Sequence, residues 1–330
     1  MTIYFIRGVN DLSQVQVDLD SKGKFVPILD GSCNVYGKLP INRDRVNSII
    51  LCGKSVSQRG VRFKNKPSLF FNQISDPDSH SGALERCVKL CEQIDSPVIN
   101  HPANIQQTTR DGVAILLQGI PGVVMPRTFR FRPVSPQDAL QFAKSSGVEL
   151  PFIIRISGDH NGRSMVRVSD SLKLDALHAL PFDGRDYYLT EYVDYKDNSG
   201  HYHKQRLVVI DGQVILRHAI FNKDWIVHGS NRDYMTDYES WEDYLKRTKK
   251  IEKEVLPKLA PAIEEIHRRL GLDYFGIDCC IGEDGEMLIF EANANMNILY
   301  NGFPELDPLV NQIKSRIVLM MEQRCGEKIS

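Results

Sequence analysis

Asp278 and Glu291 are the residues whose types and spacing point most directly to chemistry. They lie in two strand-like segments, residues 275–281 and 286–293, which are separated by Asp284-Gly285. That dipeptide favours a two-residue hairpin turn, and counting outward from such a turn sets the two carboxylates opposite each other on one face. The other face is expected to be core, built from Phe275, Ile277, Cys279, Ile281, Leu288 and Phe290.

Two opposed carboxylates repel each other unless a cation lies between them. At a separation of about 5 Å and an effective dielectric constant near 20, the repulsion is about 3 kcal/mol. Asn293 lies two residues beyond Glu291, so it shares the same face and adds an amide oxygen. Such oxygens suit Mg²⁺ or Mn²⁺. We therefore expect a metal site on Asp278, Glu291 and Asn293, with a solvated edge hairpin as the alternative.

Composition describes an ordinary globular protein with room for two or three packed units. The chain has 330 residues, of which 42% are hydrophobic and 25% charged, and its formal net charge is -1. No global basic field therefore favours nucleic acid or an anionic membrane as a partner. No apolar run approaches the roughly 18 residues of a membrane span, and the N-terminus lacks the apolar stretch of a signal peptide.

Cysteine and histidine usage indicates a cytoplasmic protein with reduced thiols. Seven cysteines is an odd number, and no Cys-x-x-Cys pair occurs. His201 and His203 could supply two zinc ligands, but nothing nearby completes a tetrahedral set. Two solvated histidines on a surface hairpin are the alternative.

Strand-like and helix-like segments alternate, which indicates an α/β fold. A small α/β domain ending near residue 100 is expected from strands at 3–7, 48–52, 68–73 and 97–100 and a helix at 81–94. Further helices are expected at 103–117, 136–146, 172–180, 241–270 (with interruptions at Pro257 and Pro261) and 309–321. Further strands are expected at 123–131, 152–157, 163–169, 187–192, 204–210 and 213–220, the last two joined at Asp211-Gly212.

A glycine loop between two of these strands could bind an anion. Gly158 and Gly162 would let backbone N–H groups approach it closely, and Arg155 on the incoming strand could bind phosphate oxygens bidentately. The loop has neither a P-loop signature nor GxGxxG, and a hairpin with two turn glycines and no ligand is the alternative. The basic run at 59–66 is a solvated loop or a second anion contact.

The strand at 187–192 continues into Asp194 and could read an adenine edge. Its backbone groups could do so directly, with Glu191 or Asp194 accepting from an amino or ribose group. Arg206 and Arg217, on the next hairpin, could reach the same anion. The alternatives are a plain core strand and two surface arginines.

The order of these segments resembles the ATP-grasp superfamily over roughly residues 97–300. It is most similar to ribosomal-protein S6 glutamate ligases, bacterial glutathione synthetases and ATP-grasp peptide ligases. The resemblance implies a small N-terminal α/β domain followed by two α+β subdomains that hold ATP. The expected domains are residues 1–100, 101–190 with the glycine loop, and 191–330 with the metal hairpin.

The resemblance also implies roles for individual residues. It assigns nucleotide binding to Arg110, Arg155, Gly158, Gly162, Glu191, Tyr192, Val193 and Asp194. It assigns the binding of two magnesium ions to Asp278, Glu291 and Asn293. It assigns contact with the reacting phosphoryl group to Arg206 and Arg217. This chain departs from the family in having arginine for both nucleotide lysines and in Lys204, which stands where an acidic ribose contact is usual. After Asn293 the chain reads Ala-Asn-Met-Asn, so the acceptor side differs as well.

The implied activity is that of an ATP-dependent carboxylate–amine ligase. ATP would phosphorylate a small-molecule or peptide carboxylate, and an amine, or occasionally a thiol, would attack the acylphosphate. A homodimer is common in such families. One alternative is a kinase of the same fold that phosphorylates an alcohol such as an inositol phosphate, with Arg217, Lys223 and Lys204 as extra cations. The other is a nucleotide-binding protein without turnover.

Overall fold

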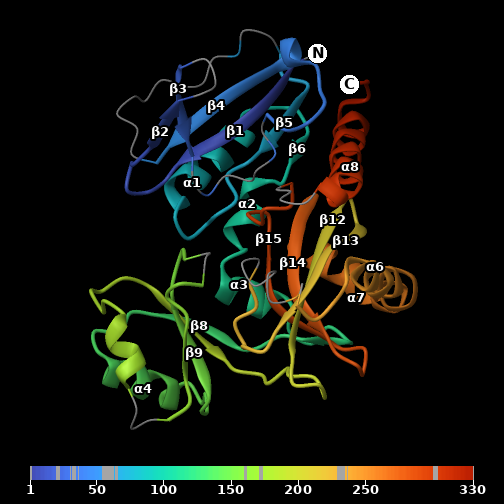
Figure 1. The fold of residues 1–330 in the computed structure, drawn as a ribbon. Coiled ribbons are helices and arrows are strands. Elements are labelled where there is room, and N and C mark those ends of the chain that lie inside the picture. Colours follow the sequence, from blue (N-terminus) through green and yellow to red (C-terminus); the bar gives the residue numbers. More distant parts are fainter. Residues whose placement is uncertain are drawn as a thin grey trace.

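The computed structural model of the protein describes residues 2–19, 23–29, 31, 35, 37–53, 63, 66–159, 162–170, 174–228, 235, 237–299 and 304–329. Most of the basic run at 59–66 and the centre of the glycine loop lie outside these ranges. The described residues form sheets of four, four and five strands (Figure 1). They also form a separate two-stranded hairpin of β2 (Gln16–Leu19) and β3 (Phe25–Ile28), which the sequence analysis did not anticipate.

The N-terminal sheet is parallel and confirms the expected α/β arrangement. Its strands lie in the order β4 (Val46–Cys52), β1 (Ile3–Val9), β5 (Leu69–Asn72) and β6 (Val98–Ile99). Helix α1 (Ser81–Cys91) packs one face of it through Ala83, Leu84 and Cys87. The carboxyl ends of parallel strands share one edge, where ligands commonly bind in open α/β sheets.

The central sheet is antiparallel and has one apolar and one polar face. Its strands lie in the order β10 (Val166–Val168), β9 (Phe152–Ile156), β11 (Tyr187–Glu191) and β8 (Thr128–Phe131). Helix α4 (Pro136–Ser145) begins at the cap Ser135 and covers the apolar face. The helix expected at 172–180 is a 3₁₀-helix over Asp175–Ala179.

The C-terminal sheet holds both predicted hairpins. Its strands lie in the order β13 (Gln213–Asn222), β12 (Tyr202–Ile210), β14 (Tyr274–Ile281), β15 (Met287–Asn293) and the short β7 (Val123–Val124). Asp211 and Gly212 join β12 to β13 with φ angles of 49° and 77°, as a type I′ turn requires. This turn is confirmed.

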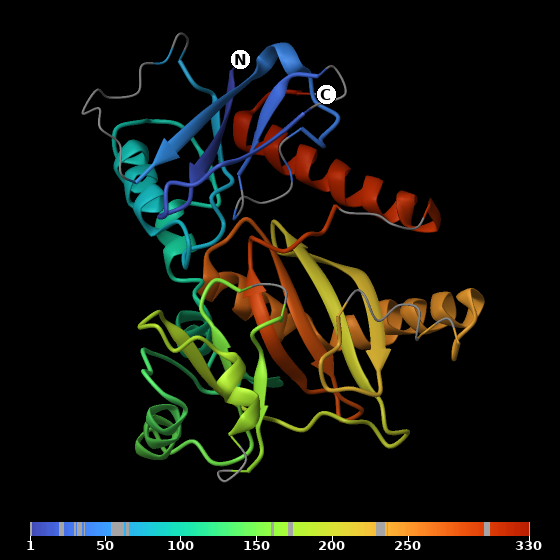
Figure 2. The same ribbon diagram turned by 60° about the vertical axis from the view of Figure 1, so that its left-hand side comes forward.

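Helices cover both faces of the C-terminal sheet and join it to the N-terminal sheet. Helix α7 (Leu256–Leu270) packs one face, and this core continues onto the α1 side of the N-terminal sheet. Helix α8 (Asp307–Cys325) lies between the two sheets and packs with the other face of each (Figure 2). The central sheet and α4 have an apolar core of their own. The boundaries expected at residues 100 and 190 stay predictions.

The helix expected at 103–117 is two helices with a sharp corner between them. These are α2 (Pro102–Gln106) and α3 (Arg110–Leu116). The Thr109 side chain accepts from the N–H of Gly112 and starts the new helix. A Cβ on Gly112 would lie 2.4 Å from the carbonyl oxygen of Gln107, so glycine permits the corner. As a result Arg110 stands at a helix start instead of inside a helix.

The single strand expected at 123–131 was wrong. The segment forms β7, which pairs with β15, and β8, which pairs with β11, so it crosses from one sheet to another. Pro126 between them lacks the N–H that a continuous ladder needs, which explains the break. The crossing places Met125 and Pro126 at the pocket described below.

The long helix expected at 241–270 is present with one irregularity. A π-helical turn at Ile251–Val255 separates α6 (Trp241–Lys250) from α7. Pro257 follows at once and cannot donate within a regular helix, so the widened turn relieves the mismatch. Pro261 lies inside α7 without ending it. None of the helices in the described ranges has the length and apolarity needed to cross a membrane.

The core shared by the N-terminal and C-terminal sheets should dominate stability. Ile277 on β14 is completely buried in it. Replacing it with alanine should lower the free energy of unfolding by about 2–5 kcal/mol, because deleting buried methylenes loses transfer energy and leaves a cavity. Urea unfolding followed by circular dichroism measures this change.

Ile115→Ala is the matched control, since this side chain is 74% exposed on α3. It should change the free energy of unfolding by no more than about 0.5 kcal/mol. Equal effects of the two substitutions would contradict the assigned core.

Candidate active site

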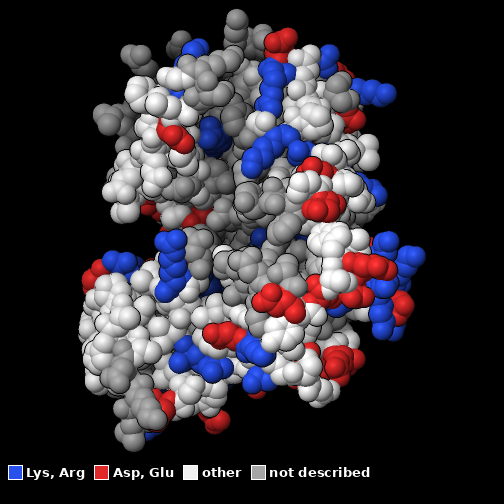
Figure 3. Space-filling model, viewed as in Figure 1, with Lys and Arg blue, Asp and Glu red and all other residues white. Residues whose placement is uncertain are grey.

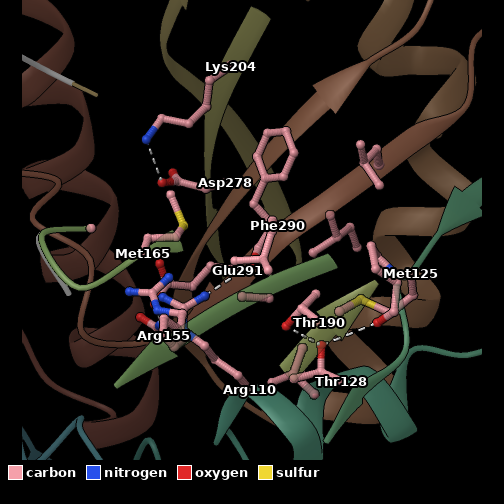
Figure 4. Close-up of a pocket in the computed structure, with 18 of the residues that line it drawn as sticks. Arg110, Met125, Thr128, Arg155, Met165, Thr190, Lys204, Asp278, Phe290 and Glu291 are labelled. Atoms are coloured by element: carbon pink, nitrogen blue, oxygen red, sulfur yellow. Dashed lines mark hydrogen bonds and ion pairs between the residues drawn. The ribbon is translucent and has the colours of Figure 1, made fainter. Parts of the chain in front are cut away.

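A pocket lies where the central sheet, the β14–β15 hairpin, α3 and the loop after β5 meet. Figure 3 shows the surface hollowed between the lower-left lobe and the upper part of the molecule. Figure 4 shows side chains from the central sheet, the β14–β15 hairpin and α3 pointing toward one another across it. Most of the residues selected from the sequence line this pocket, namely Arg110, Arg155, Gly162, Glu191, Tyr192, Val193, Arg206, Asp278, Glu291 and Asn293.

The polar face of the central sheet forms one wall of the pocket. Because β8, β11 and β9 are neighbours, their residues line up in rows across the sheet. One row is Thr128, Thr190 and Ile153, and the two threonine hydroxyls lie 3.1 Å apart. The next row is Arg130, Tyr188 and Arg155. Alternation along each strand sends the residues between these rows into the α4 core.

The β14–β15 hairpin pairs Asp278 with Glu291 as predicted, although its turn was predicted wrongly. Gly282 donates to the carbonyl of Glu286 at 2.9 Å, which leaves a three-residue loop ending in Gly285 instead of a two-residue turn. The register then shifts once between Asp278 and Cys279, where β15 has one extra residue, Phe290. This β-bulge restores the pairing that the shorter turn had implied.

The longer turn changes which residues of β15 between it and the bulge face the core. Met287 and Ile289 pack into the core, whereas Leu288 and Phe290 line the pocket. Leu288 is buried, but it pairs with Cys280 on the pocket side, so the expectation that Leu288 and Phe290 share the core face of Ile277 and Cys279 was wrong. Without the bulge Glu291 would point into the core, since alternation sends neighbouring residues to opposite faces.

Cations from two elements hold the two carboxylates. Arg206 is directly opposite Asp278 and donates to both of its oxygens, at 2.6 and 2.8 Å. Lys204 Nζ lies 3.2 Å from Asp278, and Arg110 Nη2 lies 2.8 Å from Glu291 (Figure 4). Asp278 is 4% exposed, and burial alone would raise its pKa, but Arg206 and Lys204 hold that pKa well below its ordinary value.

Arg155 is a buried cation with unused hydrogen-bonding capacity. It is 8% exposed, and burial together with the neighbouring charge of Arg110 lowers its pKa to about 10. It donates to the carbonyl oxygen of Asp159, while its Nε has no partner among the residues that the structure describes. A guanidinium in this state favours an anionic ligand, because an unsatisfied buried donor costs about 1–3 kcal/mol.

The hairpin residues supply oxygen ligands of the kind that Mg²⁺ prefers. Asp278 and Glu291 face the same side, and Asn293 donates from Nδ2 to Glu291 Oε1 at 2.7 Å. The described ranges contain no cluster of three His, Cys, Asp or Glu residues placed to hold a metal. The predicted site has two carboxylates and the amide of Asn293, so it is not a cluster of that kind. Its oxygen donors nevertheless fit a hard divalent cation. The metal site stays a prediction.

The far end of the pocket is mainly apolar. Met125, Ile153, Leu288 and Phe290 line it, and residues 191–193 line the pocket as well. The carboxylate of Glu191 accepts from Arg127 N at 3.0 Å and Nε at 2.7 Å, and these bonds hold the end of β11 to the segment before β8. This arrangement suits a flat, largely apolar ring.

Some residues selected from the sequence do not line the pocket. Asp194 is exposed and accepts from Lys196 N at 3.3 Å, and Arg217 donates from Nε to the carbonyl of Ile298 at 2.8 Å. Gly158 lies beside the pocket, with φ of 77°. His203 lies 2.8 Å from an Asp197 oxygen, and His201 lies 2.8 Å from Ser199 Oγ.

Other pocket residues were not selected from the sequence. Lys204 was noted as a departure from the family pattern and as an extra cation of the kinase alternative, and Asn295 was noted only as part of the Ala-Asn-Met-Asn departure. Ser75, Asp78 and His228 were not considered. Burial and the charges of Lys204 and Arg206 lower the pKa of His228. Ser75 and Asp78 could have been selected from the sequence, because they belong to a polar run directly after a buried parallel strand.

Sequence comparison gives one distant curated relative and no family model. The chain is 22% identical over 245 residues to N-acetylaspartylglutamate synthase A from Mus musculus, which covers 73% of this chain and 60% of the relative. The chain therefore spans less than two thirds of the length of that relative. No family model matches it.

Comparison with solved structures identifies the fold. The VanG D-Ala:D-Ser ligase from Enterococcus faecalis matches with a TM-score of 0.54 and 13% identity, over 97% of this chain and 98% of that one. The D-alanine–D-alanine ligase from Bacillus anthracis, solved with ATP, matches with a TM-score of 0.51 and 12% identity, over 99% of this chain and 97% of that one. Both are ATP-grasp ligases. The chain has the ATP-grasp fold, and the resemblance seen in its motifs is confirmed at that level.

Proposed function

We propose that the protein is an ATP-dependent ligase that joins a carboxylate to an amine. The observation that supports this most strongly is a single pocket with an apolar slot at one end and three arginines beside two opposed carboxylates at the other. Such a pocket suits a purine ring with a phosphate chain. The ligase and synthase names of the similar proteins support amide formation.

In this proposal the apolar slot holds adenine. Backbone groups of residues 191–193 read its edge, and Arg155 and Arg110 bind the α- and β-phosphates. Arg155 gains a partner for its buried Nε when an anion enters. The glycine loop then approaches the phosphates, since Gly158 and Gly162, with φ of 77° and 68°, leave room for backbone N–H contacts.

Asp278, Glu291 and Asn293 would hold Mg²⁺, which supplies charge neutralisation at the β- and γ-phosphates. Arg206 would then turn from Asp278 to the γ-phosphoryl group and the carboxylate. A carboxylate oxygen attacks the γ-phosphorus, the bond to the β-phosphate oxygen breaks, and ADP leaves. The amine nitrogen next attacks the acyl carbon, and inorganic phosphate and a proton are released.

Among the residues that the structure describes, one of the three extra cations expected for the kinase alternative lines the pocket. Of its three candidates, Lys204 lines the pocket, whereas Arg217 donates to Ile298 and Lys223 lies 5.3 Å from the ring centre of Tyr238. We therefore favour the ligase. The substrates are a small-molecule or peptide carboxylate and an amine; homodimerisation and a cytoplasmic location remain predictions.

Metal dependence tests the acidic pair. Glu291→Gln keeps the shape of the side chain and removes one charge, so it should lower ADP release at limiting Mg²⁺ by at least about tenfold, while the melting temperature is retained. Coupled-enzyme kinetics and calorimetric Mn²⁺ titration measure the two effects. Glu283→Gln, at the tip of the same hairpin, is the control and should change neither quantity. Unchanged turnover in Glu291→Gln would exclude this ligand.

Nucleotide affinity tests the buried arginine. Arg155→Ala should raise the Kd for ATP at least about tenfold, because charge-assisted hydrogen bonds contribute about 1.5–3 kcal/mol. Arg155→Lys should recover part of the loss. Arg132→Ala is the control: this arginine directly follows β8 of the same sheet but is 71% exposed and pairs with Asp186. Isothermal calorimetry that finds wild-type affinity in Arg155→Ala would refute the assignment.

The fate of the γ-phosphate separates ligase from kinase. With a suitable acid, Mg·ATP and hydroxylamine, we expect an acyl hydroxamate and stoichiometric inorganic phosphate. Arg206→Ala should reduce hydroxamate formation about 100-fold while weakening ATP binding far less, because its charge acts chiefly as the phosphoryl group moves. Colorimetric hydroxamate detection and phosphate release measure this. Recovery of labelled γ-phosphate on a hydroxylamine-resistant product would establish a kinase instead.

A further inference from the structure

The loop that follows β5 in the N-terminal sheet is held in a fixed shape by its own side chains. The carboxylate of Asp76 accepts from the N–H of Asp78 at 3.0 Å and from the hydroxyl of Ser79. The N–H of Asp11 donates to the carbonyl of Ser79 at 2.8 Å. Ser75 and Asp78 both line the pocket. Neither has a role in the proposed chemistry so far.

At one end this loop is tied to the central sheet. The Tyr188 hydroxyl donates to Asp78, lying 2.7 and 2.8 Å from its two oxygens, and Arg130 donates to both Asp78 and the Tyr188 oxygen. The Arg130 guanidinium lies 4.8 Å from the ring centre of Tyr188. Asp78 has a 7% exposed side chain, and a Cβ on Gly158 would lie 3.9 Å from its Cβ. The loop therefore also lies close to Gly158 at the start of the glycine loop.

At the other end the loop is tied to the metal hairpin. The Ser75 hydroxyl lies 3.0 Å from Asn295 Oδ1, and the N–H of Asn295 donates to Asn293 Oδ1 at 2.9 Å. Asn293 in turn donates to Glu291. A chain of polar contacts thus runs from Tyr188 on the central sheet, through the loop, to Glu291 on the C-terminal sheet.

Asp78 also contacts the row of residues on the central sheet that contains Arg155. Arg130, Tyr188 and Arg155 lie side by side on three neighbouring strands. Asp78 pairs with Arg130, which Asp111 and Asp186 also approach at 3.5 and 3.4 Å, whereas Arg155 keeps an unused donor. Burial and the nearby Asp78 raise the pKa of Tyr188, so its hydroxyl stays a donor to Asp78. Tyr188 is thereby held in place, and it is the residue directly opposite Arg155 on the neighbouring strand.

We propose that Asp78 is a positioning residue that couples the phosphate-binding arginine Arg155 to the metal hairpin through the loop at 75–80. Asp78 binds Tyr188 and Arg130 and so holds the polar face of the central sheet that carries Arg155. At the other end of the loop, Ser75 contacts Asn295, which in turn contacts Asn293. Nucleotide binding at the central sheet then also reduces the mobility of the end of β15. The proposal rests on the proposed function only in taking ATP as the ligand of the pocket.

Asp78→Asn tests this coupling because it removes the charge and keeps the size. Calorimetry should show a Kd for ATP raised about fivefold or more. Hydrogen exchange should quicken in residues 152–159 and also in residues 287–299, and ATP should protect the second segment less than in the wild type. A residue that only supports the loop locally would alter the first segment and leave residues 287–299 unchanged.

Asp186→Asn is the matched control. Asp186 also contacts Arg130, at 3.4 Å, but it lies within the central sheet's own lobe and makes no bridge to the loop. It should leave residues 287–299 and ATP affinity as in the wild type, whereas Tyr188→Phe should reproduce part of the Asp78→Asn effect. Equal effects of Asp78→Asn and Asp186→Asn, or unchanged exchange at 287–299 in Asp78→Asn, would overturn the coupling. A wild-type protein that fails to bind ATP would instead overturn the proposed function.

Discussion

The opposed carboxylates of Asp278 and Glu291 impose the constraint on which the rest of the site depends. Both face a poorly solvated pocket, where like charges cannot remain close without compensation. Arg206 and Lys204 come from β12, and Arg110 comes from the start of α3. This compensation requires β12 to pair with β14, and it requires α3 to begin at Arg110, close to Glu291. The corner at Gly112 and the bulge at Phe290 are the backbone irregularities that meet these demands.

The three sheets have different roles in the pocket because their apolar cores are arranged differently. The N-terminal and C-terminal sheets share cores through α7 and α8, so they form a continuous support for the acidic pair. The central sheet has a separate core under α4 and offers its polar face to the pocket. Its attachment to the rest includes hydrogen bonds and ion pairs at Asp78, which are cheaper to rearrange than a buried apolar core. The side of the pocket with Arg155 is thus the side best able to respond to a ligand.

Much of the site could be predicted from local pattern. Alternating strands with an intervening Asp-Gly indicated the pairing of Asp278 with Glu291, and glycines after Arg155 indicated an anion loop. The predicted pairing was correct although the turn was not, because the longer turn and the bulge at Phe290 offset each other. Their cancellation left the pair on one face but moved Leu288 and Phe290 from the expected core to the pocket. A one-residue change in register reverses every side chain beyond it, and turn chemistry alone does not reveal a bulge.

The sequence by itself determined most of the helices and strands and the acidic face of the hairpin, because these depend on periodicity and turn residues over a few positions, and the order of its motifs carried the resemblance to the ATP-grasp superfamily. Only the tertiary structure decided that Lys204 lies at Asp278, that Arg110 binds Glu291, and that Asp78 binds Tyr188. The last two pairs join residues more than a hundred positions apart, and nothing in the neighbourhood of either partner specifies the other. Their meeting is set by how sheets and helices pack to bury apolar surface, which fixes the positions of the polar side chains on the opposite faces.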